Sequence, residues 1–238
     1  MASQYEEAFI DSVGGRLFVR SWNPQSAARA ALVAVHDFTS HGGRYERFAI
    51  HLAEHGIAVH ALDLRFAHSV DDIDALMRSD RVRQRSMPLF VMGHGAGAVA
   101  VSVYALRRKG SLAGLICESI ALDLPVSAAL FGWVRVRHFA AFIRARSRLR
   151  SSLAQLSLPL LVLHGSSDTV TLPSGSEHMH GRSASPDKTL QIFEGYYHDL
   201  INGQGHEQVA ERILRWIEDR LNPEHRNQIG IAYINADT

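Results

Sequence analysis

This chain of 238 residues has one cysteine, almost no net charge and no long uninterrupted apolar segment. Its one cysteine, Cys117, excludes an internal disulfide framework and lies in an apolar run, which predicts a packed thiol. With 25 Lys and Arg against 24 Asp and Glu, the formal net charge is +1, so no nucleic-acid partner is expected. The apolar run 88–106 is interrupted by Gly93, Gly95 and Gly97, which argues against a membrane span.

The first residues also lack the features of a secretory leader. Residues 1–7 are acidic, without a basic region or an apolar core, so a cytoplasmic location is expected. A hydrophobic content of 46% and a charged content of 21% fit one globular domain with a sizeable core. We expect this domain over residues 1–221, with a cap at about 120–157 and a peripheral tail at 222–238.

The order of apolar patterns predicts an α/β fold. Two strands, 9–13 and 17–22, flank a Gly-Gly turn, and strand and helix patterns alternate after them. We expect further strands at 30–35, 57–62, 112–117, 158–164 and 189–193, a strand, turn and helix within 88–108, and helices at 44–55, 70–77, 174–180 and 209–221. This alternation predicts a doubly wound, mostly parallel sheet of about eight strands.

The chain has glycine at a position where the surrounding pattern predicts a nucleophile. Gly93-His94-Gly95-Ala96-Gly97 follows an apolar strand and precedes a helix, which is the layout of a G-x-S-x-G nucleophile elbow with glycine in place of serine. Gly95 has no side chain to attack a substrate. Serine hydrolysis through an acyl-enzyme is therefore excluded, because losing the nucleophile costs on the order of 10⁶ in turnover.

Other polar residues follow the ends of the predicted strands, where the chemistry of such sheets is located. Asp168 follows the strand 158–164, and His198 follows the strand 189–193. Together with position 95 they occur in the order nucleophile, Asp, His, which is the order in α/β-hydrolases.

The chain resembles the monoacylglycerol lipase and lysophospholipase group of α/β-hydrolases, the serine aminopeptidase S33-like enzymes. The resemblance rests on the four segments 36–45, 93–97, 164–168 and 187–198. It implies an α/β-hydrolase fold with a carboxylic ester hydrolase ancestry, a small acyl ester or lipid-like ligand and no cofactor.

The resemblance also assigns positions in the site. The triad would fall on Gly95, Asp168 and His198, and the oxyanion hole on the backbone N–H groups of Phe38 and Ala96. Asp168 would orient the imidazole, and His198 would transfer the proton.

Three further features depart from the family pattern. Asp37 and Thr39 stand where family members usually have glycine, the glycine-rich segment after Arg65 is missing, and the cap is short. We therefore expect severe loss of ester hydrolysis. The alternatives are a pseudohydrolase that binds an acyl ligand or a protein partner, and a weak hydrolase in which His198 activates a water held in the space of the lost serine.

Three serines near the predicted strand ends could be offered as replacement nucleophiles. Ser119, Ser166 and Ser167 are more simply interpreted as strand-end or turn hydroxyls.

A competing metal motif lies in the helix 44–55. His51, Glu54 and His55 match the pattern H-x-x-E-H of some zinc metallopeptidases. The same helix commits Leu52 to the core and leaves His51 and Glu54 on its polar side, so no metal is expected, and the zinc enzyme remains a remote alternative.

The cap is rich in arginine and has no acidic residue from 124 to 167. Aromatic residues lie among its arginines at 135, 137, 144, 146, 148 and 150. Peripheral contact with an anionic membrane is one interpretation. The favoured one is that the aromatic side chains pack over the pocket while the arginines are solvated.

Overall fold

The computed structural model describes residues 3–65, 68–82, 87–108, 110–124 and 136–222. Its strands are β1 (Gln4–Ser12), β2 (Gly15–Asn23), β3 (Ala30–Val35), β4 (Ile57–Leu62), β5 (Leu89–His94), β6 (Gly114–Glu118), β7 (Leu160–Gly165) and β8 (Lys188–Phe193). Its α-helices are α1 (Glu46–Glu54), α2 (Ser69–Arg78), α3 (Ala96–Arg107), α4 (Val136–Ser152), α5 (Pro173–Arg182) and α6 (His206–Leu221).

The eight strands form one twisted sheet in the order β1-β2-β4-β3-β5-β6-β7-β8. β1 pairs antiparallel with β2, and β2 antiparallel with β4, whereas all later neighbours are parallel. The strands β3 and β4 are continuous apolar runs interrupted only by His60, and every residue in them is buried. Strands covered on both faces need this composition, which explains why β3 and β4 lie in the interior of the sheet.

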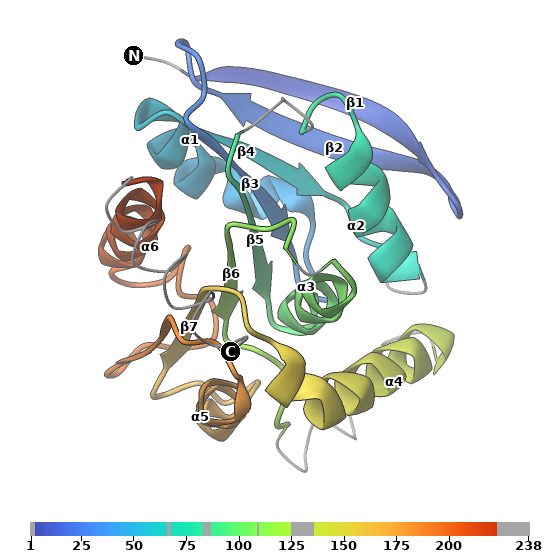
Figure 1. Cartoon of the computed structure of the whole chain (residues 1–238), viewed down its shortest axis with the longest axis vertical. Helices are drawn as coiled ribbons and strands as arrows, with labels where there is room; N and C mark the ends of the chain where they lie inside the picture. The colour runs from blue at the N-terminus through green and yellow to red at the C-terminus, as the bar shows by residue number, and fades with distance from the viewer. Residues whose placement is uncertain (1–2, 66–67, 83–86, 109, 125–135, 223–238) are drawn as a thin grey trace, which may run out of the picture.

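Helices cover both faces of the sheet, as Figure 1 shows. α1 and α6 pack on one face through a cluster that includes Leu52 and Trp216. α2, α3 and α5 pack on the other face, and α4 lies against α3. α3 is buried from Ala96 to Ala105 because its small side chains let it approach the sheet closely.

The predicted α/β arrangement is confirmed, with differences at the element ends. The hairpin, the strands and the helices occur in the expected order. α3 begins at Ala96 instead of residue 98, because Gly95 turns the chain directly into the helix. Cys117 is fully buried, as expected of a packed thiol, and burial raises its pKa to about 12.

The predicted cap contains the helix α4, while residues 125–135 of the cap lie outside the described part of the chain. The predicted tail, 222–238, lies outside it except for Asn222, and so do Phe66 and Ala67 in the shortened segment after Arg65. Among the described residues, no helix has both the length and the apolar composition needed to cross a membrane.

Candidate active site

The turn at Gly95 has the geometry of a nucleophile elbow. Gly95 lies between β5 and α3 with φ 56° and ψ −118°, a region that side-chain-bearing residues rarely occupy. A Cβ at Gly93 would lie 2.5 Å from the backbone of Ala98, and one at Gly97 would lie 2.4 Å from the carbonyl oxygen of Val35. Glycine on both sides of position 95 therefore lets strand and helix meet at this sharp turn.

The space beside Gly95 is filled by the side chain of Asp37. A Cβ at Gly95 would lie 2.5 Å from Cγ of Asp37 and less than 3 Å from both of its carboxylate oxygens. Asp37 Oδ1 accepts a hydrogen bond of 2.8 Å from the backbone N–H of Ala96, the first residue of α3. The negative charge is favourable there, because the amino end of a helix carries free N–H groups and a positive partial charge.

Asp168 and His198 are joined as the sequence predicted. His198 Nδ1 lies 2.8 Å from Asp168 Oδ2, and both residues come from loops at the carboxyl ends of neighbouring strands, β7 and β8. Asp168 also accepts from the N–H groups of Val170 and Thr171, at 2.8 and 3.0 Å, and from the Thr171 hydroxyl, at 2.8 Å, and its Oδ2 lies 3.1 Å from His164 Nε2. This carboxylate is therefore rigidly placed.

His198 lies between two carboxylates. Its Nε2 is 3.5 Å from Asp37 Oδ2, on the side opposite to Asp168. Burial by itself would lower the pKa of His198, but Asp168 and Asp37 together raise it to about 9. The imidazole is therefore a cation at neutral pH.

The carboxylates of Asp37 and Asp168 are both ionised, because their neighbours lower their pKa values. Burial would raise the pKa of Asp37, but hydrogen bonds from His198 and from the backbone N–H groups of Ala96 and Phe38 outweigh it and lower the pKa to about 2. Burial also opposes ionisation of Asp168, whose pKa is nevertheless held well below its ordinary value by His164 and His198. The three side chains form one ion-pair network.

Comparison with known proteins identifies the family of this chain. The family model described as "Serine aminopeptidase, S33" matches residues 26–133 and 128–205, which together cover most of the chain. The chain belongs to the serine aminopeptidase S33 family.

Curated relatives agree with this assignment. The chain is 24% identical to the monoacylglycerol lipase of Mycolicibacterium smegmatis, with 92% of this chain and 99% of the relative aligned. It is 25% identical to the human monoglyceride lipase, with 89% of each chain aligned.

Solved structures agree in fold. A thermostable carboxyl esterase from Bacillus coagulans has a TM-score of 0.81 at 16% identity, covering 93% of this chain and 100% of the esterase. The Paleococcus ferrophilus monoacylglycerol lipase has a TM-score of 0.70 at 21% identity, covering 86% and 99%. The expected α/β-hydrolase fold is confirmed, and the chain is a monoacylglycerol lipase-like member of the S33 family.

Within this S33 chain, three buried residues, His94, Glu118 and Ser119, hold the backbone around His198, a role that the sequence did not indicate. The carbonyl oxygen of His198 accepts a hydrogen bond of 2.8 Å from the Ser119 hydroxyl and lies 3.2 Å from His94 Nε2. Glu118 Oε1 accepts from the N–H groups of Leu200 and Ile201, at 2.8 and 3.2 Å. The sequence signal for this role was position, since Glu118 is the last residue of β6, the strand next to β5, and Ser119 follows it.

Glu118 and Arg44 extend this support. Arg44 donates to His94 Nδ1 and to Asp199, the latter at 2.5 Å. These bonds connect the turn before α1 to the loop that carries His198. Burial raises the pKa of Glu118 to about 7, although nearby Arg44 opposes the rise.

Two of the three alternative nucleophiles, Ser119 and Ser166, and the water hypothesis can be compared with the contacts in the structure. The Ser119 hydroxyl donates to a carbonyl, and Ser166 Oγ accepts from Gly195 N–H, so both are structural hydroxyls as expected. The water hypothesis places a water in the space beside Gly95, and the Asp37 carboxylate lies in that space.

The metal motif in α1 does not become a site. The His51 and His55 rings lie 4.9 Å apart, but they and Glu54 do not form a group of three close ligand atoms. Within the described ranges, the three side chains that do gather are Asp37, His94 and His198. Both ring nitrogens of His94 are already engaged, by Arg44 and by the His198 carbonyl, so His94 is a support for the loop and a poor ligand.

The helix α4 packs beside the site in the way the favoured cap interpretation predicts. The Phe142 ring meets the Phe38 ring edge to face at 5.0 Å, and Leu149 is fully buried. Arg144 and Arg148 are exposed, as that interpretation predicts, whereas Arg146 and Arg150 donate to the carbonyl of Leu122. Of the six cap arginines, 135 and 137 lie outside the residues whose side chains are described.

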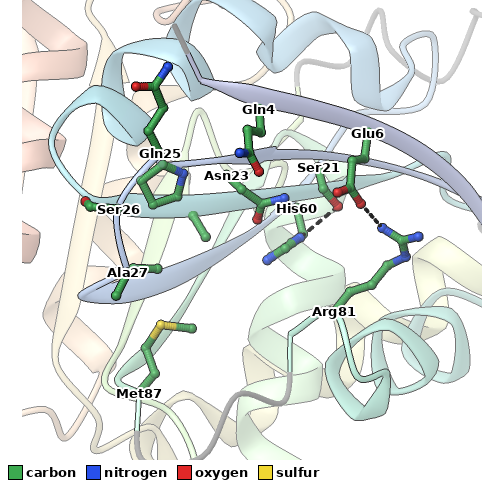
Figure 2. A pocket seen from close by; sticks show the side chains of 13 residues that line it. Gln4, Glu6, Ser21, Asn23, Gln25, Ser26, Ala27, His60, Arg81 and Met87 are labelled. Carbon is green, nitrogen blue, oxygen red and sulfur yellow. Dashed lines mark hydrogen bonds and ion pairs between the residues drawn. The ribbon is translucent and has the colours of Figure 1, made fainter. Parts of the chain in front are cut away.

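A separate cavity of about 490 Å³ lies at the opposite end of the sheet, around the first residues of the parallel strands (Figure 2). His60 in it is paired with Ser21 at 2.9 Å, and burial lowers the pKa of His60 to about 4. Arg81 is paired with Glu6 at 2.8 Å. This cavity shares no residue with the candidate active site.

Proposed function

We propose that this protein is a monoacylglycerol lipase-like hydrolase by descent that has lost serine ester hydrolysis, and that it is a pseudohydrolase toward esters. The observation that carries the proposal is the Asp37 carboxylate, which lies beside Gly95 and accepts the N–H of Ala96. A small acyl ester or lipid-like molecule is the ligand class expected of its ancestry.

Acyl transfer of the family type needs three parts, and each is compromised. It needs a nucleophile, but position 95 has no side chain. It needs N–H groups free to bind the oxyanion of the substrate, but Ala96 N–H already binds a carboxylate. It also needs a neutral histidine as general base, but the pKa of His198 is raised to about 9.

The test compares four proteins on short-chain esters and monoacylglycerols: the natural chain, Gly95→Ser, Asp37→Gly and the double variant Asp37→Gly/Gly95→Ser. We expect ester turnover only in the double variant, at least about 10²-fold above the natural chain, because a restored nucleophile needs both a free oxyanion hole and a neutral histidine. Gly95→Ser alone stays inactive, since Asp37 still occupies the site.

The matched control adds His198→Gln to the double variant, which must remove the new activity if it uses the histidine as base. Ester turnover by the natural chain that depends on His198 would overturn the proposal. Activity of Gly95→Ser equal to that of the double variant would show that Asp37 does not block the site.

A further inference from the structure

The Asp37 carboxylate fills the space beside Gly95, and it is also placed where it could react with a ligand. Its carboxylate stands where the side chain of an elbow residue would begin, with Oδ1 on the N–H of Ala96 and Oδ2 3.5 Å from His198 Nε2. Its side chain is 17% exposed, whereas that of Asp168 on the far side of the imidazole is fully covered. Of the two carboxylates on His198, only Asp37 can meet a ligand.

An ionised carboxylate in such a position is a nucleophile, and the surrounding groups select its electrophile. Attack on an acyl carbon would create an oxyanion on the substrate, but Ala96 N–H is already bound to Asp37. Attack on a saturated carbon creates no such oxyanion. It needs instead a leaving group that the site can accept.

The protonated His198 beside Asp37 determines which leaving group the site favours. His198 carries a proton on the side facing Asp37, and Asp168 holds the ring through Nδ1. An acid at this point assists a leaving oxygen, which must be protonated, more than a leaving halide. A strained cyclic ether has such an oxygen and needs no further activation.

We propose that the site opens small epoxides to vicinal diols, with Asp37 as the nucleophile and His198 as the proton donor and acceptor. This goes beyond the proposed loss of serine ester hydrolysis, and it does not require a serine at position 95.

In the first step, an oxygen of Asp37 attacks an epoxide carbon and the carbon–oxygen bond of the ring breaks. The alkoxide takes the proton from His198 Nε2, which leaves a hydroxyalkyl ester on Asp37 and a neutral imidazole. Loss of the Asp37 charge removes one of the two carboxylates that raise the pKa of His198. The histidine is thereby converted from an acid into a base.

In the second step, neutral His198 takes a proton from water while the water oxygen attacks Cγ of Asp37. The oxyanion forms on an oxygen of Asp37 itself, which the Ala96 N–H is placed to stabilise. When the intermediate collapses, the diol oxygen leaves with the proton from His198. Asp37 retains one water oxygen and returns its remaining proton to His198, so epoxide and water give the diol with no other reactant.

The test uses the natural chain with styrene oxide as the probe, followed by chromatography of the diol and mass spectrometry of the intact protein. We expect diol formation by the natural chain. Asp37→Asn should lower the rate at least about 10³-fold, because it removes the nucleophile. Quenching the natural chain during turnover should trap protein that is heavier by one styrene oxide, with the added mass on the peptide that contains Asp37. His198→Gln should slow the formation of both adduct and diol, because it removes the acid of the first step and the base of the second.

Two controls make the outcome decisive. Asp74→Asn removes a carboxylate on α2 outside the site and should keep the full rate. A single turnover with excess protein in heavy-oxygen water should give unlabelled diol and labelled Asp37, because the diol takes its new oxygen from the carboxylate.

Absence of both diol and adduct with the natural chain, whose folding is checked by its melting transition, would overturn the inference. Label in the diol of the first turnover would also overturn it, since water would then attack the epoxide directly. These results leave the ester test unaffected, because that test depends on the Asp37→Gly/Gly95→Ser variant.

Discussion

The two halves of the candidate site differ in what their side chains supply. On the acid and histidine side, Asp168 and His198 are paired, Thr171 also bonds to Asp168, and Glu118 and Ser119 hold the His198 loop. On the nucleophile side, the turn has the geometry of an elbow, but Gly95 supplies no side chain.

The difference between the halves shows how a turn without a reactive side chain can still be stabilised electrostatically. With glycine at position 95, the helix N–H groups and the neighbouring histidine still favour a negative charge. Asp37 supplies that charge from another loop and forms an ion pair with His198 of the other half.

The largest expected effect comes from breaking the acid and histidine side. Asp168→Ala should destabilise the protein by about 3–5 kcal/mol, because it leaves a buried histidine cation with only Asp37 as counter-charge. Chemical denaturation measures the loss. Asp74→Ala, which removes a surface ion pair with Arg108, should cost much less, and equal losses would contradict the assigned difference.

On the nucleophile side, Gly95→Ser should destabilise the fold by about 1–3 kcal/mol through backbone strain, with an added cost from overlap with Asp37. Gly110→Ser is the matched control, because Gly110 also has a positive φ of 82° but no atom within 4 Å of its Cβ position.

Adding Asp37→Gly to Gly95→Ser should recover the part of the loss that comes from overlap. A double-mutant cycle from melting curves measures it, since the two positions are in contact and should not be additive. Additive losses would mean that Asp37 does not fill the nucleophile space.

The coupling of the two halves predicts a pH dependence. The pKa of His198 is raised to about 9 from an ordinary value near 6.5, so its stabilising contribution is complete below about pH 6.5 and is lost as the pH rises through about 9. Asp37→Asn should lower the pKa of His198, as followed by NMR of its ring protons, and weaken this loss of stability. An unchanged pKa would show that the two side chains are not coupled.

The smallest effect should come from the support of the His198 loop. Ser119→Ala removes one hydrogen bond to the His198 carbonyl and should cost about 1 kcal/mol. Ser151→Ala, which removes an exposed hydroxyl bond within α4, serves as the control. The idea that Ser119 holds the loop would be abandoned if both variants melted alike and the His198 ring signals did not shift.

Much of the fold was predictable because its signals are local. The runs 30–35 and 57–62 are apolar throughout or nearly so, and they form β3 and β4 with the predicted bounds. The ends of α3 and β6 were less accurate, since packing around Gly95 and the pairing with β5 decide where they begin.

The site was predictable to the extent that it follows strand ends. Asp168 and His198 come together because parallel neighbours place their following loops at one edge of the sheet. The contact of Asp37 with position 95 had no such signal, because it joins the loops after β3 and β5 and depends on which way one side chain turns.

The amino-acid sequence by itself determined the order of strands and helices, the elbow and the absence of a serine from it, since each follows from residue type and spacing. Only the tertiary structure decided which side chain occupies the space beside Gly95. A carboxylate 58 residues away fills the space, because the helix N-terminus and the histidine that remain there are more stable with a negative charge than without one.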